Sequence, residues 1–227
     1  SWFRNFKTMF DANFALRATI EGEALVNDEI KVGTFLDINS TVHYKMSQLM
    51  QIAKLFNAGQ VEPGTIFFFG DVEFWGLEAV RLMADMNNVP VYLTGFLHAA
   101  SYTKGDAFAI ADRYQKFTEL GWYHALDKVF FGSQYHKNAF LERRLMKAGF
   151  ENEDDDPDFY EADKKLVVTK NPIFENDYKV VGLKKKKQII LTNRMDKEKN
   201  CMQSLTLMRD LHKAHPDWKF VVTTGRK

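Results

Sequence analysis

The chain has 227 residues, of which 45% are hydrophobic, 27% charged and 14% aromatic, a profile typical of a folded globular protein and not of a disordered one. Its 31 Lys and Arg residues almost balance 30 Asp and Glu residues, so the net charge is +1. This balance excludes a protein that binds nucleic acid mainly by neutralising phosphates, and it leaves room only for a local basic patch. The length fits one large domain or two small ones.

The cysteine content and the distribution of apolar residues bear on location. A single cysteine, Cys201, excludes an internal disulfide framework and is typical of a reducing compartment. The most apolar run, residues 65–69, is only long enough for a strand. The first residues include Arg4, Lys7 and Asp11 and therefore lack the smooth apolar stretch of a secretory signal. We expect a cytoplasmic protein without a transmembrane segment.

The amino-terminal part begins with aromatic side chains at helical spacing, which predicts an amphipathic helix over the first ten residues or so. Residues 18–42 are harder to assign, with strand-like pieces around 30–38. Residues 44–57 place Met and Leu side chains on one face, and Pro63-Gly64 follows, so the pattern predicts a second helix that ends before this turn.

From residue 65 onward, short apolar runs alternate with amphipathic segments. The predicted strands are 65–69, 89–93, 128–131 and 166–169, and the predicted helices pass through 77–84, 107–120 and 139–149. This alternation indicates βαβ units and a Rossmann-like α/β fold, a parallel sheet with helices on both faces. Ligands of such sheets bind beyond the carboxyl ends of the strands.

After Pro172 the pattern changes. A stretch without clear periodicity ends in four lysines, and a strand, a helix and a strand then follow over 188–192, 201–211 and 219–223. We predict an amino-terminal domain over 1–172, a linker over 173–187 and the start of a second Rossmann-like domain over 188–227. One β-α-β unit has too small a core to be a domain, so we expect the second domain to be only partly present and the chain to be a fragment.

The turn 193–200, with the sequence Asn-Arg-Met-Asp-Lys-Glu-Lys-Asn, connects the first strand and the helix of this second unit. Arg194 and Lys199 are five positions apart, so both can point at one anion near the helix amino terminus. Backbone N–H groups and the helix dipole favour negative charge there. The alternative is an exposed polar turn whose charges are only solvated.

This strand and turn resemble the segment that opens the second domain of GT-B-fold glycosyltransferases, where Arg and then Lys followed by Gly or Asn come after an apolar strand. Residues 129–133, 167–173 and 218–222 are similar to further strand segments of that family, in the same order, so the resemblance covers roughly residues 65–227. It implies that Arg194 and Lys199 hold the diphosphate of a nucleotide-sugar donor. The family's ribose-binding acidic residues would lie beyond Lys227, and its glycine-rich loop would precede Ser1 or be absent, which argues against catalysis by this chain alone.

His98 lies beyond the strand predicted at 89–93. A histidine at this place resembles the one that in GT-B enzymes contacts the donor sugar or assists catalysis. An imidazole takes or gives a proton near neutral pH, which suits that role. The alternative is a histidine that is only hydrogen-bonded within a loop.

Asp71, Glu73 and Trp75 follow the strand predicted at 65–69. Either carboxylate can act as general base for an acceptor hydroxyl, and the indole can stack on a sugar or a base. Asp-x-Glu also resembles the metal-binding pair of GT-A glycosyltransferases, but the downstream segments favour GT-B, which needs no metal. The alternative is a helix that Asp71 caps, with Glu73 in its first turn.

Other polar residues have simpler interpretations. Ser133 and Asp106 are predicted first as helix N-caps, with Ser133 as a second choice a residue of the binding cleft. The acidic run 151–158 and the lysine run 184–187 are predicted to be solvated. The histidines lack the spacing of zinc ligands, so we expect neither a metal nor another cofactor.

The sequence thus predicts a glycosyltransferase that moves a sugar from a nucleotide-sugar donor to an unidentified acceptor, which can be a glycan, a small molecule, a protein or a nucleic acid. Two alternatives remain open. One is a non-catalytic α/β module that binds a carbohydrate or a nucleotide. The other is a transferase acting on bases in DNA, suggested by the lysine run and the aromatic residues near the strand ends.

Overall fold

The computed structural model describes the following parts of the chain: residues 2–13, 17–25, 38–104, 106–145, 164–171, 182, 184–192 and 199–223. The chain divides into two compact units, the first made of residues 1–25 and 39–174, the second of residues 26–38 and 175–227.

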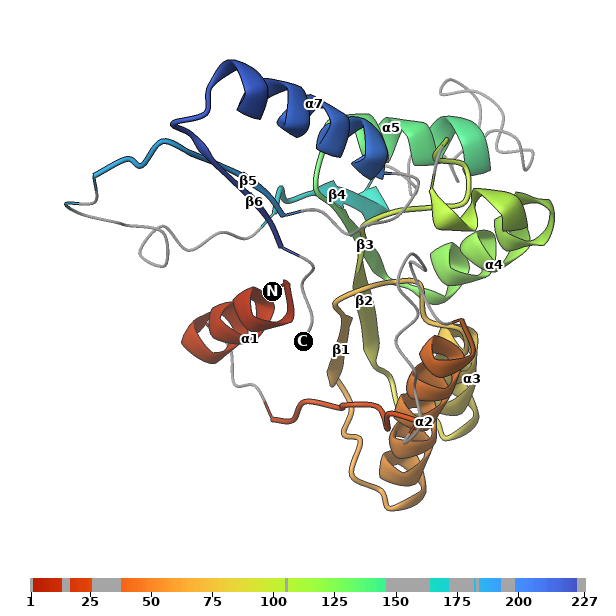
Figure 1. Ribbon diagram of the computed structural model, residues 1–227. Helices are drawn as coiled ribbons and strands as arrows, with labels where there is room; N and C mark the ends of the chain where they lie inside the picture. The colour runs from red at the N-terminus through yellow and green to blue at the C-terminus, as the bar shows by residue number, and fades with distance from the viewer. Residues whose placement is uncertain are drawn as a thin grey trace. The chain divides into compact units, whose positions relative to one another are not determined.

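The first unit is built on a four-stranded parallel sheet in the order β1-β2-β3-β4, so the strand order never reverses among the described strands (Figure 1). Its elements in chain order are α1 (Trp2–Asn13), α2 (Ile38–Asn57), β1 (Ile66–Phe69), α3 (Leu77–Met86), β2 (Tyr92–Leu97), the 3-10 turn η1 (Ala107–Ala111), α4 (Asp112–Ala125), β3 (Lys128–Phe131), α5 (Gln134–Phe140), the π-helical turn η2 (Leu141–Leu145) and β4 (Leu166–Val168). The α/β class and the parallel sheet are confirmed.

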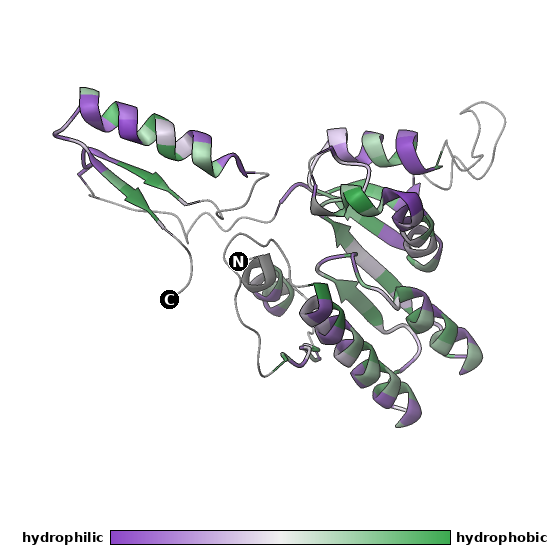
Figure 2. Ribbon diagram, turned by 45° about the vertical axis from the view of Figure 1, so that its right-hand side comes forward, coloured by the Kyte–Doolittle hydropathy of each residue, from purple (hydrophilic) through white to green (hydrophobic). Residues whose placement is uncertain are grey.

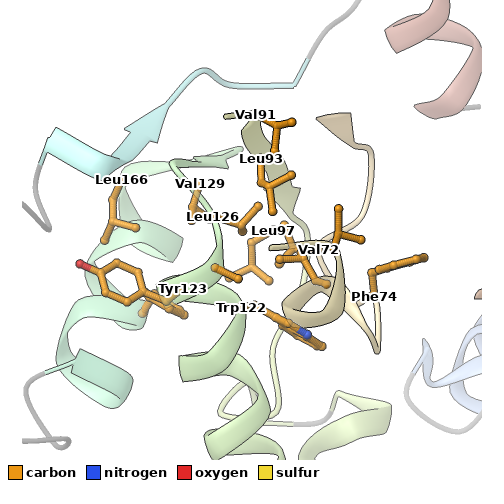
Figure 3. Close-up of a cluster of buried hydrophobic side chains, with 14 of the residues drawn as sticks. Val72, Phe74, Val91, Leu93, Leu97, Trp122, Tyr123, Leu126, Val129 and Leu166 are labelled. Carbon is orange, nitrogen blue, oxygen red and sulfur yellow. The ribbon is translucent and has the colours of Figure 1, made fainter. Parts of the chain in front are cut away.

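The main core lies on one face of this sheet. Alternate strand residues such as Leu93, Val129 and Leu166 are buried there against apolar side chains of α2, α3 and α4. Figure 3 shows this cluster, with Trp122 of α4 beside Leu97 and with Tyr123 near Leu166. In Figure 2 the strands are coloured mainly as hydrophobic, whereas the helices around them alternate between hydrophobic and hydrophilic segments.

The opposite face of the sheet carries a row of phenylalanines. Phe6 of α1 lies 4.9 Å from Phe68 of β1 and 5.6 Å from Phe96 of β2, measured between ring centroids, and Phe10 lies 4.7 Å from Phe68. Because side chains alternate along a strand, these rings lie on the face away from the main core. Aromatic residues at helical spacing therefore form the helix that was expected, and the helix covers the second face.

Several elements differ from their predicted boundaries, among them β2 and α2. The second strand is β2 at 92–97 instead of 89–93, because Pro90 has no N–H to donate to the ladder, and pairing begins where the Tyr92 amide reaches the Thr65 carbonyl at 2.9 Å. Helix α2 begins at Ile38, earlier than the predicted residue 44. The strand-like pieces at 30–37 and the helix end at 146–149 lie outside the described residues.

The second unit contains a parallel β-α-β arrangement. Strand β5 (Gln188–Leu191) pairs with β6 (Lys219–Val222), and helix α7 (Cys201–Ala214) connects them. Cys201 and Met208 are the buried apolar side chains of α7. These elements lie where the sequence pattern placed them. The domain boundaries themselves stay a prediction. None of the described helices is long and apolar enough to cross a membrane.

Gly95 of β2 allows the chain after β1 to cross close to the sheet. A Cβ atom at this position would lie 2.6 Å from Cγ2 of Val72 and 3.2 Å from the carbonyl oxygen of Phe69. The Val72 amide also donates to the Phe96 carbonyl at 3.0 Å, so this segment cannot move away without losing that bond.

Gly95→Ala is therefore expected to destabilise the protein by about 1–3 kcal/mol, the usual cost of overpacking a core. Urea denaturation measures the change. Gly121→Ala in α4 is the matched control, because its Cβ would meet only the flexible Glu78 side chain at 3.0 Å, so helix propensity favours it. Equal stability of the two variants would contradict this account of Gly95.

Candidate functional site

Polar side chains gather where the parallel strands of the first unit end. Asp71 and Glu73 follow β1, His98 follows β2 directly, and Ser133 and His136 follow β3. Parallel strands end on the same side of a sheet, so these residues share one end of it. We call Asp71, Glu73, Trp75, His98 and His136 the sheet-end cluster.

The segment after β1 is fixed by two core residues. Val72 and Phe74 are buried, and Figure 3 shows both side chains at the margin of the hydrophobic cluster. The segment is not helical, because α3 begins only at Leu77, after Gly76 with a φ of 110°. The alternative in which Asp71 caps a helix is therefore wrong. The Asp71 Oδ1 atom instead accepts a hydrogen bond from the Glu73 amide at 3.2 Å.

Glu73 is the most unusual residue of the cluster. Its exposed fraction is 8%, and its Oε1 atom has no hydrogen-bond partner among the described residues. Burial, followed by the charge of Asp71, raises the pKa of Glu73 to about 8, although Lys45 acts in the opposite direction. At neutral pH this carboxyl group is mainly protonated, so it can donate a hydrogen bond.

Lys45 of α2 lies close to both Asp71 and Trp75, which the sequence placed at one site only because both follow the same strand. Its Nζ atom lies 3.7 Å from the Asp71 carboxylate and 5.0 Å from the centroid of the Trp75 ring. The ammonium therefore balances Asp71 and occupies one face of the indole. Trp75 is half-buried, and the Phe108 ring lies 6.1 Å from it, so any stacking on a ligand is restricted to what remains of the ring.

His98 is held by the backbone of the loop after β1. Its Nε2 atom lies 2.8 Å from the Gly70 carbonyl oxygen. A carbonyl only accepts hydrogen bonds, so Nε2 is a nitrogen of this ring that carries a proton. His98 is thus hydrogen-bonded within a loop, as the alternative interpretation predicted. The same hydrogen bond fixes the tautomer of the ring that a catalytic role would use.

Ser133 and His136 lie at the start of α5. The Ser133 Oγ atom accepts a hydrogen bond from the His136 amide at 3.2 Å, so Ser133 is the N-cap of α5 as its first interpretation predicted. The His136 ring packs against Phe131 and Tyr102, with centroids 5.3 and 6.1 Å away. Burial, and then the charge of His98, lowers the pKa of His136. Its Nε2 atom is buried and has no partner among the described residues.

A buried ionic network supports the loop after His98. Glu119 of α4 accepts hydrogen bonds from the Ser101 amide at 2.7 Å and from the guanidinium of Arg144. Arg144 also bonds Asp112 and donates to Ser101 Oγ at 2.8 Å. Its guanidinium carbon lies 4.7 Å from the centroid of the Tyr102 ring. Asp106 caps the turn η1 by accepting from the Phe108 amide at 2.9 Å, as predicted.

The residues predicted to bind the donor belong to the second unit. Arg194 lies outside the described residues. Lys199 is exposed in the turn before α7, and Asn200, which follows it, has a left-handed φ of 50°. Lys199 is thus at a helix amino terminus, where the sequence pattern placed it.

Three residues around the site were missed by sequence reasoning, namely Lys45, Glu119 and His136. Glu119 had a usable signal, because it lies four residues after Gln115 and three before Trp122, on the buried stripe of α4. A charged residue on such a stripe needs a buried partner. Lys45 and His136 had no comparable signal, since their roles depend on contacts between distant segments.

Comparison with family models, with curated proteins and with solved structures finds no match for this chain. In the described ranges, no three His, Cys, Asp or Glu side chains come together in a way that could hold a metal ion. The observations available for a functional assignment are therefore the geometry of the sheet-end cluster and the sequence motifs.

Proposed function

We propose that the chain is a nucleotide-sugar-dependent glycosyltransferase of GT-B architecture, in which the first unit is the acceptor-side domain and the second unit begins the donor-binding domain. The observation that carries the proposal is Glu73, a buried carboxyl group with an unpartnered oxygen, at the same end of a parallel sheet as Asp71 and His98. The parallel sheet followed by a further β-α-β unit is compatible with this architecture.

The proposed reaction joins an acceptor oxygen to the anomeric carbon of the donor sugar. The bond from that carbon to the phosphate oxygen breaks, and the nucleoside diphosphate leaves with the electron pair. A base at the sheet end takes the hydroxyl proton. Asp71 or His98 would take this part, whereas protonated Glu73 suits a hydrogen bond to a substrate oxygen. His98 would face the transferred sugar.

Arg194 and Lys199 would bind the donor diphosphate. Charge-assisted hydrogen bonds to phosphate contribute about 1.5–3 kcal/mol each, which corresponds to roughly 10- to 150-fold in affinity. Developing negative charge on the leaving diphosphate would be stabilised by the same two cations and by the amino terminus of α7.

Arg194→Ala and Lys199→Ala are each expected to weaken nucleoside-diphosphate binding at least tenfold while leaving the fold intact. A thermal-shift screen of UDP, GDP, ADP, dTDP and their sugar conjugates first finds the nucleotide, and calorimetry then gives its dissociation constant. Arg209→Ala and Lys213→Ala are matched controls on α7, because both residues are exposed beyond its first turn.

The screen also separates the proposed function from a binding module. Stabilisation by a sugar nucleotide together with release of free nucleoside diphosphate supports the transferase. Binding without release, also in a version of the protein that carries a complete donor-binding domain, supports the non-catalytic module. Affinities that do not change in the Arg194 and Lys199 variants, or the absence of any response to the screen, would overturn the proposed donor site.

A further inference from the structure

One face of α4 and of the preceding turn η1 exposes apolar side chains in a row. The exposed fractions of Ile110, Tyr114 and Phe117 are 95%, 64% and 66%. Tyr114 and Phe117 are three residues apart and therefore lie on one side of α4, and Ile110 lies in η1, directly before the N-cap of the helix. This is unusual for a helix that uses its other side, through Gln115, Glu119 and Trp122, to pack in the protein. We call Ile110, Tyr114 and Phe117 the α4 stripe.

Two exposed cations lie among the members of the α4 stripe, and the half-exposed Asp112 beside them is paired with Arg144. Arg113 and Lys116 are exposed between its members, and Lys116 Nζ lies 5.0 Å from the centroid of the Phe117 ring. The two acidic residues of α4, Asp112 and Glu119, both bind Arg144. In the described part of the chain, Arg113 and Lys116 form no ion pair with an acidic side chain. The stripe therefore presents apolar and cationic groups together.

We propose that the α4 stripe docks the protein on an anionic lipid surface. Ile110, Tyr114 and Phe117 would insert between the headgroups, and Arg113 and Lys116 would reach lipid phosphates while their apolar stems stay against the hydrocarbon boundary. Aromatic and aliphatic residues combined with cations on one helix face are the composition of an interfacial helix. The inference does not depend on the proposed transferase activity.

The size and shape of the stripe favour lipid over a protein partner. Buried aromatic side chains cover about 150–250 Å² each, so three side chains supply roughly 500 Å². A specific protein interface needs about 800 Å² on each partner. Side chains that protrude from a single helix also fit a surface that deforms around them, as a bilayer does.

Co-sedimentation with lipid vesicles tests this inference on the whole chain. The vesicles are phosphatidylcholine alone, or phosphatidylcholine with roughly 30% phosphatidylglycerol, at an ionic strength of about 0.1 M. We expect binding to the anionic vesicles, weak binding to the neutral ones, and release at high salt.

Two sets of substitutions distinguish the two parts of the surface. The triple variant Ile110→Ser, Tyr114→Ser and Phe117→Ser is expected to lose at least tenfold in partition coefficient, and the double variant Arg113→Gln and Lys116→Gln about fivefold for each cation. Circular dichroism checks that both variants fold. Leu82→Ser with Met86→Ser is the matched control, because these side chains are also exposed but lie on α3 beside Glu78 and Asp85.

Failure of the wild-type protein to bind the anionic vesicles would overturn the inference, as would equal binding by the triple variant. A dimer in sedimentation velocity that the triple variant abolishes would assign the stripe to a second copy of the chain and would equally overturn it. Loss of binding in the control as well would show that exposed apolar residues bind lipid irrespective of the α4 stripe.

Discussion

Glu73→Gln is expected to change stability by less than about 1 kcal/mol at pH 5 and to raise it by about 2–5 kcal/mol at pH 9 relative to the wild-type protein. At pH 5 the buried carboxyl group is protonated and Gln is a close substitute for it. At pH 9 the wild-type protein must bury an ionised carboxylate, and the amide of Gln avoids this cost.

The sign follows from the direction of the shift. The pKa of Glu73 is about 8 in the folded protein and 4.5 in the reference state. Between these values the folded state binds more protons than the unfolded state, so this group makes stability fall as pH rises. The contribution is fully present below pH 4.5 and is lost by the time pH exceeds 8.

Urea denaturation at pH 5, 7 and 9 measures the difference between wild type and variant. The difference is needed because His136 and Lys165, whose pKa values are both lowered by burial, change stability in the opposite direction as pH rises. These contributions are common to both proteins and cancel. Glu78→Gln, on the exposed side of α3, is the control and should give parallel profiles. A constant difference between wild type and Glu73→Gln at all pH values would mean that Glu73 is not buried as a neutral acid.

The same residue shows what a sequence can reveal about this site. The apolar run before Gly70 predicted the strand, and parallel strands fixed the end of the sheet where Asp71, Glu73 and His98 lie. The burial of Glu73 was not predictable, because it depends on Val72 and Phe74 entering the core on either side of it. A local pattern of alternating apolar and acidic residues is equally typical of the first turn of a helix.

The starts of helices were predicted well where a capping side chain next to them in the sequence determines them. The start of a strand was predicted poorly, because it depends on pairing with another strand. Ser133 and Asp106 cap their helices because a short oxygen-bearing side chain before a helix meets free N–H groups in almost any context. The start of β2 depends on Pro90 together with the partner strand, and Lys45 reaches Asp71 and Trp75 only in the folded chain. The periodicity of a sequence carries no information about contacts between distant segments.

A buried ion pair between Glu119 and Arg144, which corresponds to no sequence motif, supports the loop that carries His98. Ser101 is three residues after His98, and its amide is bound by Glu119, whose exposed fraction is 1%. Glu119 in turn is neutralised by Arg144 from η2. The loop that carries His98 is therefore held through a charge pair in the protein interior, so the site and the stability of the fold depend on the same residues.

Arg144→Met is expected to destabilise the protein by about 3–5 kcal/mol, because it leaves Glu119 buried without its counter-charge. The exposed fraction of the Arg144 side chain is 6%, so water cannot replace the guanidinium without local opening. Urea denaturation gives the free energy of unfolding. Arg17→Met is the matched control, since it removes an exposed ion pair with Glu62 and should cost less than about 1 kcal/mol.

The double variant Arg144→Met and Glu119→Met separates two contributions to the loss of stability, namely the loss of the ion pair and the burial of a single unpaired charge. With both charges removed, apolar side chains of similar length fill the space, and we expect the double variant to be more stable than Arg144→Met alone. The Ser101 amide loses its acceptor, so some destabilisation relative to wild type should persist. A double variant less stable than Arg144→Met would show that the unpaired Glu119 carries no penalty in that single variant, and it would contradict this account of the pair. Hydrogen exchange of the Ser101 amide would then indicate whether the loop after His98 opens before the sheet does.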